Sequence, residues 1–123
     1  MRHEVEKLWG SESWSHNDDK YCMKTLFLNS GFQSSMHYHK VKEETFQVVA
    51  GKVKLEYMPW YKDGVDTFDV VKQVYLQPYQ DFTLLPGVPH RFTAITPTAV
   101  IVEASTKHSD EDVVRLEESR AIE

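Results

Sequence analysis

The sequence predicts an all-β protein. Short runs of aliphatic and aromatic residues, separated by turn residues, recur from about residue 21 to residue 106. In one of them, residues 52–60, Val53, Leu55 and Tyr57 alternate with charged residues, which is the period of two typical of a half-buried strand. Many short strands at regular spacing, with turn chemistry between them, indicate a β-sandwich or a β-barrel.

The expected strands follow one another along most of the chain. They span residues 21–29, 33–39, 44–50, 52–60, 65–71, 73–76, 81–85, 90–95 and 99–105. Gly51 and the Pro-Gly-Val-Pro run at 86–89 separate strands, and Lys-Asp-Gly at 62–64 predicts a hairpin. Only residues 110–119 have the pattern of a short helix, with Asp110 as its N-cap.

Length and composition suit one soluble domain over residues 1–123, with a barrel at about 20–106, an N-terminal arm at 1–19 and an acidic tail at 107–123. No apolar run approaches the ~18 residues that span a bilayer, so no membrane partner is expected. The charged N-terminus lacks the apolar stretch of a signal peptide, which predicts a cytoplasmic location. The net charge is −5 without a dense basic cluster, so a nucleic-acid partner is not expected either.

Cys22 is the single cysteine, and its neighbours predict a small apolar side chain on a strand.

Four side chains indicate a site for one divalent transition metal. His37 and His39 lie two apart on an expected strand, so their imidazoles project from the same face. The charged residues 40–43 are long enough to reverse the chain, which brings the Glu44 carboxylate opposite the histidine pair. His90 follows a rigid turn and completes the predicted ligand set. Such ligands accept several first-row ions, including Mn, Zn, Fe, Ni and Co.

The same alternation predicts which residues line the pocket around the metal. Phe46 shares the face of Glu44, Ser35 shares the histidine face, and Phe92 shares the face of His90. Lys24 lies in an otherwise apolar run and is a candidate for binding a phosphate or carboxylate of the substrate, although a surface lysine gives the same pattern. We therefore expect Lys24, Ser35, Phe46 and Phe92 to contact a small-molecule substrate.

The spacing of these residues resembles the first motif of the cupin superfamily, G-x5-H-x-H-x3-4-E-x6-G. Five residues separate Gly31 from His37, four separate His39 from Glu44, and six separate Glu44 from Gly51. The second cupin motif, G-x5-P-x-G-x2-H-x3-N, is matched in part. Gly87 and His90 fit it, whereas its opening glycine is replaced by Tyr79 or Gln80. The resemblance implies a cupin fold, a double-stranded β-helix or jelly-roll barrel, with a short C-terminal helix or extended tail.

A narrower resemblance covers nearly the whole chain. Residues 6–10, Glu-Lys-Leu-Trp-Gly, resemble the K-P-W-G opening of type II mannose-6-phosphate isomerase domains and related sugar-phosphate isomerase-like cupins. Residues 36–44 resemble their histidine- and lysine-rich metal segment, and residues 86–92 their G-V-x-H-R stretch. Residues 112–118, Asp-Val-Val-Arg-Leu-Glu-Glu, resemble the D-I-V-R-x-E-D segment that closes those domains. The resemblance implies a carbohydrate substrate, and cupins commonly form homodimers.

The predicted function is metal-dependent isomerisation or epimerisation of a sugar or sugar phosphate. Such a metal acts as a Lewis acid on a hydroxy-carbonyl compound, and a nearby base moves a proton between adjacent carbons. Glu103, in an otherwise apolar expected strand, is the candidate for this catalytic role, and Glu56 is a second. Two alternatives use the same ligands. One is an Fe(II)-dependent dioxygenase, and the other is a cupin that binds a metal or metabolite without catalysis.

Overall fold

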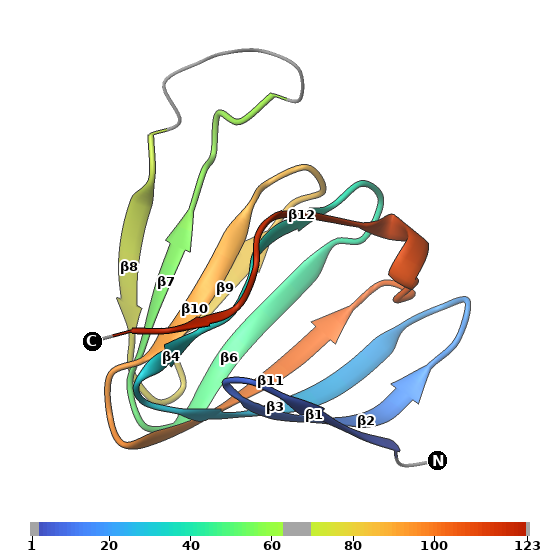
Figure 1. Ribbon diagram of the computed structural model, residues 1–123. Coiled ribbons are helices and arrows are strands. Elements are labelled where there is room, and N and C mark those ends of the chain that lie inside the picture. The colour runs from blue at the N-terminus through green and yellow to red at the C-terminus, as the bar shows by residue number, and fades with distance from the viewer. Residues whose placement is uncertain (1–2, 63–69, 123) are drawn as a thin grey trace.

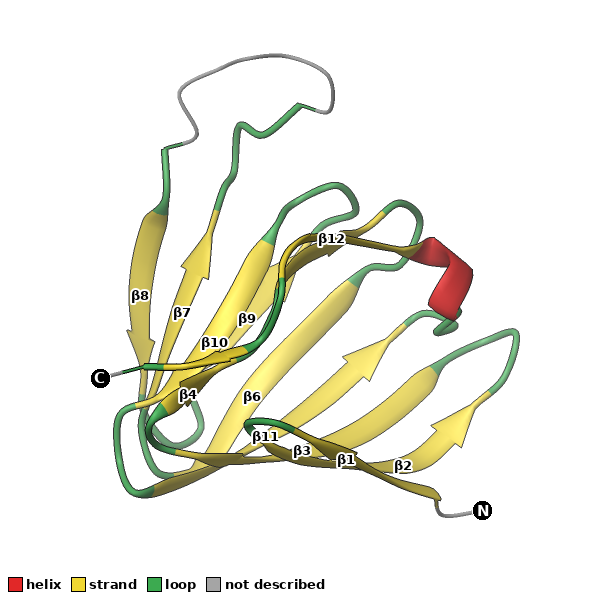
Figure 2. Ribbon diagram, in the orientation of Figure 1, coloured by secondary structure: helices red, strands yellow, loops and turns green. Residues whose placement is uncertain are grey.

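The computed structural model describes residues 3–62 and 70–122, which form two antiparallel sheets packed face to face (Figures 1 and 2). The first sheet has the strand order β1-β2-β3-β11-β6-β9. Its strands are β1 (His3–Lys7), β2 (Gly10–Asn17), β3 (Cys22–Asn29), β6 (Glu44–Ala50), β9 (Asp81–Leu84) and β11 (Thr98–Ser105). In the second sheet the order is β12-β5-β10-β4-β13, and β7 pairs with both β10 and β8. Its strands are β4 (Phe32–Gln33), β5 (Met36–His39), β7 (Val53–Tyr57), β8 (Lys72–Leu76), β10 (His90–Ala94), β12 (Val113–Glu117) and β13 (Arg120–Ala121).

The core lies between the sheets and follows the predicted alternation. In β6, Glu44, Phe46 and Val48 are buried, while the residues between them are half-buried. Val53 and Leu55 of β7 are also buried, as the pattern of residues 52–60 predicts. Burying an apolar side chain of this size stabilises the fold by about 1.5–3 kcal/mol. The all-β prediction is confirmed.

The two ends of the chain belong to the sheets. The β1–β2 hairpin extends the first sheet through the pairing of β2 with β3. The helix expected at 110–119 is limited to one 3-10 turn, Asp110–Asp112 (η1), and β12 follows it and pairs with β5. The edge of β5 explains this difference, because its free backbone groups take a strand as partner. The hairpin predicted at 62–64 and the strand predicted at 65–71 fall mainly on residues outside the described ranges.

Backbone geometry explains two positions of the cupin-like motifs. Gly51 has a φ of 75°, and a Cβ at this position would lie 2.5 Å from the carbonyl oxygen of Thr98, so the turn requires glycine. Tyr79 has a φ of 69°, so it occupies the left-handed region at the place where the second motif opens with glycine. No helix within the described residues has the length and apolar character needed to cross a membrane.

Candidate metal centre

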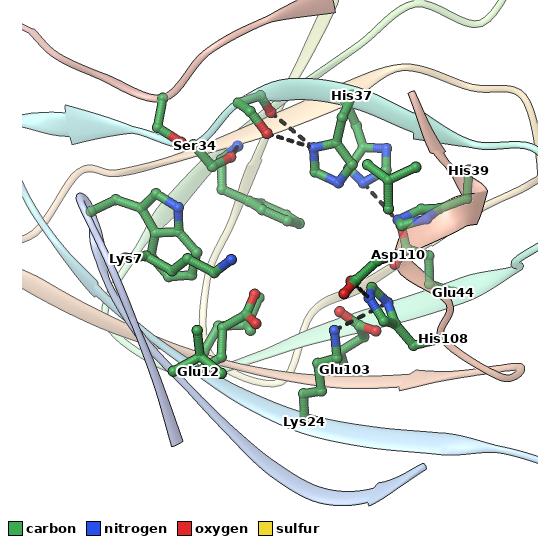
Figure 3. Close-up of a pocket in the computed structure, with 18 of the residues that line it drawn as sticks. Lys7, Glu12, Lys24, Ser34, His37, His39, Glu44, Glu103, His108 and Asp110 are labelled. Carbon is green, nitrogen blue, oxygen red and sulfur yellow. Dashed lines mark hydrogen bonds and ion pairs between the residues drawn. The ribbon is translucent and has the colours of Figure 1, made fainter. Parts of the chain in front are cut away.

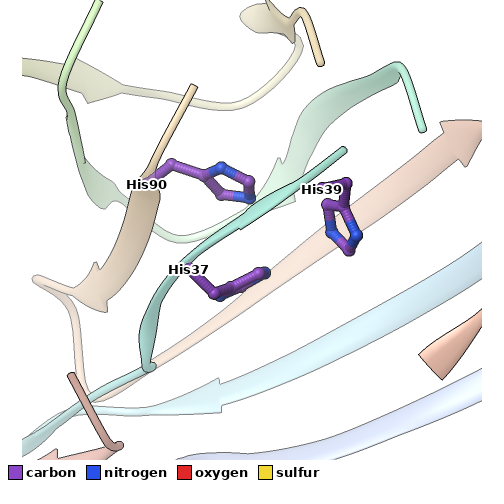
Figure 4. A group of neighbouring side chains, drawn as sticks. All are labelled: His37, His39 and His90. Carbon is purple, nitrogen blue, oxygen red and sulfur yellow. The ribbon is translucent and has the colours of Figure 1, made fainter. Parts of the chain in front are cut away.

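Three histidine side chains meet between the sheets (Figure 4). His37 and His39 project from the same side of β5, and strand pairing places His90 of β10 directly opposite His37. One ring nitrogen of each histidine lies within 4.8 Å of those of the other two. Nitrogens bound to one ion lie about 3–4 Å apart, because each bond is about 2.1 Å long. Small side-chain rotations would therefore bring the three nitrogens onto a single ion.

Hydrogen bonds fix which ring nitrogens face the centre. His37 Nδ1 donates to the carbonyl oxygen of Ser35 at 3.0 Å, and His90 Nδ1 donates to that of Val88 at 3.0 Å. Because a carbonyl oxygen only accepts, both Nδ1 atoms carry the proton. In the neutral rings the Nε2 atoms then carry lone pairs, which is the form that binds a metal.

Glu44 faces two of the histidines. Its Oε2 lies 2.9 Å from His90 Nε2 and 3.5 Å from His39 Nε2, and all three side chains are buried. Among the residues that the structure describes, neither Glu44 Oε2 nor His90 Nε2 has a hydrogen-bond partner. With the proton on Nδ1 only, His90 Nε2 is an electron-pair donor like the carboxylate oxygen, so a cation shared by the two atoms would stabilise their close approach. The donor set, three imidazoles and one carboxylate, thus fits a divalent transition metal.

The protonation states of the candidate ligands also suit metal binding. Burial lowers the pKa of His37 well below its usual range, and the charges of His90 and His39 lower it further. Burial lowers the pKa of His39 to about 4, despite the opposing charge of Glu44. Burial alone would raise the pKa of Glu44, but His90 and Lys42 outweigh it and hold that pKa well below its usual range. At neutral pH, His37 and His39 are therefore neutral and Glu44 is ionised, as metal ligands must be.

The histidines line a pocket of about 500 Å³ between the sheets (Figure 3). Strands of the first sheet contribute Lys24, Glu44, Phe46 and Glu103, and the second sheet contributes the histidines and Phe92. Ser35, which precedes β5, lines the same pocket. The four predicted substrate contacts, Lys24, Ser35, Phe46 and Phe92, thus all lie at the pocket wall together with Glu103. Val5 of β1 and Arg115 of β12 also line it, so both chain ends help to form the pocket.

A buried charge network lies beside the histidines. Lys42 is 2% exposed, and its Nζ lies 2.7 Å from Glu103 Oε2 and 3.2 Å from Glu44 Oε1. Burial alone would lower the pKa of Lys42, but the charges of Glu103 and Glu44 outweigh it and raise that pKa. His108 Nδ1 lies 3.2 Å from Lys42 Nζ and 3.3 Å from Lys24 Nζ. The network therefore joins a candidate metal ligand, Glu44, to the candidate base, Glu103.

Sequence reasoning missed two residues of this network. His108 has the pattern of an exposed polar segment, yet its side chain is 10% exposed and lies at the pocket wall. Lys42 belongs to the charged turn at 40–43, yet it is among the most buried side chains. The one local signal was the position of Lys42 two residues before Glu44, which places it on the same side of the chain if the strand begins early.

Glu56, the second candidate base, lies away from this site. It is buried on β7, but it does not line the pocket. Its Oε1 and Oε2 accept hydrogen bonds from Arg91 Nε at 3.0 Å and Nη2 at 3.1 Å. Arg91 is its register partner on β10, so strand pairing assigns Glu56 a structural ion pair.

Solved structures with the same architecture are cupins. The capsular polysaccharide assembling protein CapF of Staphylococcus aureus has a TM-score of 0.79 at 18% identity, covering 95% of this chain and 34% of that chain. Oxalate decarboxylase of Lactobacillus farciminis has a TM-score of 0.75 at 15% identity, covering 94% and 34%. KdgF from Halomonas sp. has a TM-score of 0.67 at 14% identity, covering 82% and 81%. The chain has the cupin fold, which confirms the resemblance seen in its motifs.

A curated relative adds a sequence similarity. The D-lyxose/D-mannose isomerase of Thermosediminibacter oceani is 30% identical to this chain over an alignment of 116 positions, gaps included, that covers 78% of this chain. The match covers 61% of the isomerase, so this chain spans about three fifths of the length of that relative. No model of a known protein family matches the sequence.

Proposed function

We propose that this chain is a metal-dependent isomerase or epimerase that acts on a sugar or a sugar phosphate. His37, His39, His90 and Glu44 hold one divalent transition metal in this proposal. The alternative metals are Mn, Zn, Fe, Ni and Co, because the ligand set accepts all of them. The sugar isomerase relative supports the substrate class.

One observation carries the proposal. A buried carboxylate, Glu103, shares the pocket with three histidines that can hold a metal. Aldose–ketose isomerisation requires this pair of functions, an electrophile at the carbonyl oxygen and a base at the adjacent carbon. A pocket of about 500 Å³ is also within the range of small-molecule sites.

Each residue of the pocket has a separate role in the proposed reaction. When bound, the metal supplies Lewis-acid polarisation of the hydroxy-carbonyl group. The Glu103 carboxylate takes the proton from the carbon beside the carbonyl, which leaves an enediol, and returns it to the neighbouring carbon. A proton moves between the two oxygens at the same time, so no atom or electron is gained or lost. The ammonium group of Lys42, 2.7 Å from Glu103, holds this carboxylate in place, and Phe46 and Phe92 exclude water.

Metal analysis and proton exchange test the proposal. The protein is purified without added metal salts, analysed for metals, and incubated in D2O with a panel of aldoses and their phosphates. We expect a first-row divalent ion and deuterium uptake at the carbon beside the carbonyl. Glu103→Gln should abolish this uptake and retain the metal. Glu111→Gln, which changes an exposed carboxylate outside the pocket lining, is the matched control and should keep the activity.

Two outcomes would contradict the proposed reaction and identify an alternative, and a third would contradict the role of Glu103 alone. Bound iron with substrate-dependent oxygen uptake would indicate a dioxygenase. Bound metal without turnover of any sugar would indicate a binding protein. Deuterium uptake that survives Glu103→Gln would leave isomerisation in place and remove Glu103 from its role.

A further inference from the structure

His39 differs from the other two histidines at its second ring nitrogen. The Nδ1 atoms of His37 and His90 donate to backbone carbonyl oxygens, whereas His39 Nδ1 is buried and has no hydrogen-bond partner within residues 3–62 and 70–122. Metal-binding histidines normally donate this second N–H to a carboxylate or carbonyl, which fixes the ring and its tautomer. His39 therefore lacks an orienting contact that its two neighbours have.

The charged acceptor facing this nitrogen is Asp112. Its Oδ2 lies 3.9 Å from His39 Nδ1, and its side chain is 11% exposed. This distance is too long for a hydrogen bond. A rotation of the imidazole that moves Nδ1 by about 1 Å would shorten it to the usual 2.7–3.2 Å. Asp112 comes from the far end of the chain, where η1 leads into β12.

Backbone contacts hold Asp112 firmly against β5. The first pair of β12 with β5 sets Val113 opposite His39. The Asp112 carboxylate accepts hydrogen bonds from the backbone N–H of Val41 at 2.8 Å and of Lys42 at 3.0 Å. The Lys40 N–H donates to the Asp112 carbonyl oxygen at 3.1 Å. The carboxylate is therefore fixed beside His39 and has limited freedom to move away.

We infer that Asp112 is a positioning residue of the metal centre, which accepts the Nδ1–H of His39 and so directs the His39 Nε2 lone pair toward the metal. The inference rests on the proposed metal centre. The same carboxylate fixes the turn between His39 and Glu44, so one side chain of the C-terminal segment positions two ligands. Loss of such an outer carboxylate typically weakens metal binding 10–100-fold.

Metal affinity and histidine NMR spectra test this role on the full chain. Asp112→Asn should raise the dissociation constant for Co²⁺ by about 10–100-fold. Asp110→Asn is the matched control, because Asp110 accepts from His108 Nε2 instead, and it should change the constant less than twofold. In the Zn²⁺-loaded wild type, the His39 Nδ1–H proton should resonate furthest downfield of the three ligand histidines, because its acceptor alone is a carboxylate. Asp112→Asn should shift this resonance and leave those of His37 and His90 in place.

Each contrary result is distinguishable. A wild-type protein that binds neither Co²⁺ nor Zn²⁺ would overturn the metal centre and the inference together. If the wild type binds these ions and the Co²⁺ dissociation constant of Asp112→Asn lies within twofold of the wild-type value, the inference alone is overturned. Weaker binding with an unchanged His39 resonance would assign the effect to the turn and also overturn the inference. If Asp112→Asn does not fold, a His39 Nδ1–H that lacks the downfield position in the wild type overturns it.

Discussion

Lys42 and Glu103 form a buried ion pair, with 2.7 Å between Nζ and Oε2, although Lys42 lies in a turn and Glu103 lies near the end of β11. Lys42 also contacts Glu44 at 3.2 Å, so one ammonium group faces two buried carboxylates. Such an arrangement stabilises the fold only while every charge has its partner. This dependence leads to the first prediction.

Lys42→Met should strongly destabilise the metal-free protein. The change leaves Glu44 and Glu103 buried without their shared cation, and breaking a buried pair in this way costs about 3–5 kcal/mol. The free energy of unfolding from urea titration measures the effect. Lys107→Met is the control, since Lys107 pairs with Asp19 in solvent and should cost less than about 1 kcal/mol. Equal small losses in both variants would contradict the network.

The ligand set gives the second prediction. His90→Ala should remove most of the bound metal, because it deletes a ring that lies opposite His37 and contacts Glu44. His108→Ala should retain the metal, because His108 lies at the same pocket outside the three-histidine cluster. Metal content of the purified variants measures both. Full occupancy in the His90 variant would show that the four-ligand site is wrong.

Local periodicity explains what the sequence could predict about the site. Side chains two apart on a strand share a face, so His37 and His39, and likewise Glu44 and Phe46, could be paired without coordinates. The burial of Lys42 and His108 could not be predicted in this way. The pairing of β3 with β11 sets Lys24 opposite Glu103, and these two residues contact His108 and Lys42, respectively. The two ends of the chain also pack at the same pocket. A long-range register of this kind has no signal in a single sequence.

The C-terminal segment shows the same limit. The Asp-Val-Val-Arg-Leu-Glu-Glu run has several good helix formers, and its acidic start favours a helix N-terminus. The structure pairs Val113–Glu117 with β5 instead. Tertiary pairing outweighs local propensity here, because the β5 backbone needs hydrogen-bond partners at that edge.

The third prediction concerns the pH dependence of stability. Burial alone would raise the pKa of Glu56, but hydrogen bonds and charge from Arg91 outweigh it and hold that pKa below its usual value. A lowered pKa in the folded state stabilises the protein above the unfolded-state value of about 4.3, and this contribution is lost as the pH falls through the lowered pKa. Glu56→Gln should therefore be less stable than the wild type at pH 7, with a difference that shrinks on acidification to about pH 3. Urea unfolding of both proteins at the two pH values measures it, and a difference that grows toward acid would contradict the assignment.

The fourth prediction concerns Tyr79, which adopts a φ of 69° in the turn between β8 and β9. Two backbone hydrogen bonds hold this conformation: Tyr79 N–H to Val48 O at 2.7 Å, and Gln80 N–H to Gln77 O at 2.9 Å. A non-glycine residue in the left-handed region costs about 1–2 kcal/mol, and the Tyr79 side chain, 77% exposed, offsets little of this.

Tyr79→Gly should therefore stabilise the protein by about 0.5–1 kcal/mol, after the greater unfolded-state entropy of glycine is subtracted. Differential scanning calorimetry should show a melting temperature a few degrees higher. Tyr75→Gly is the matched control, because Tyr75 is a half-exposed tyrosine within β8, where the backbone entropy of glycine alone should cost about 0.5–1 kcal/mol and loss of the ring over Lys52 adds to it. A lower melting temperature in both variants would show that the Tyr79 ring contributes more than its backbone strain removes.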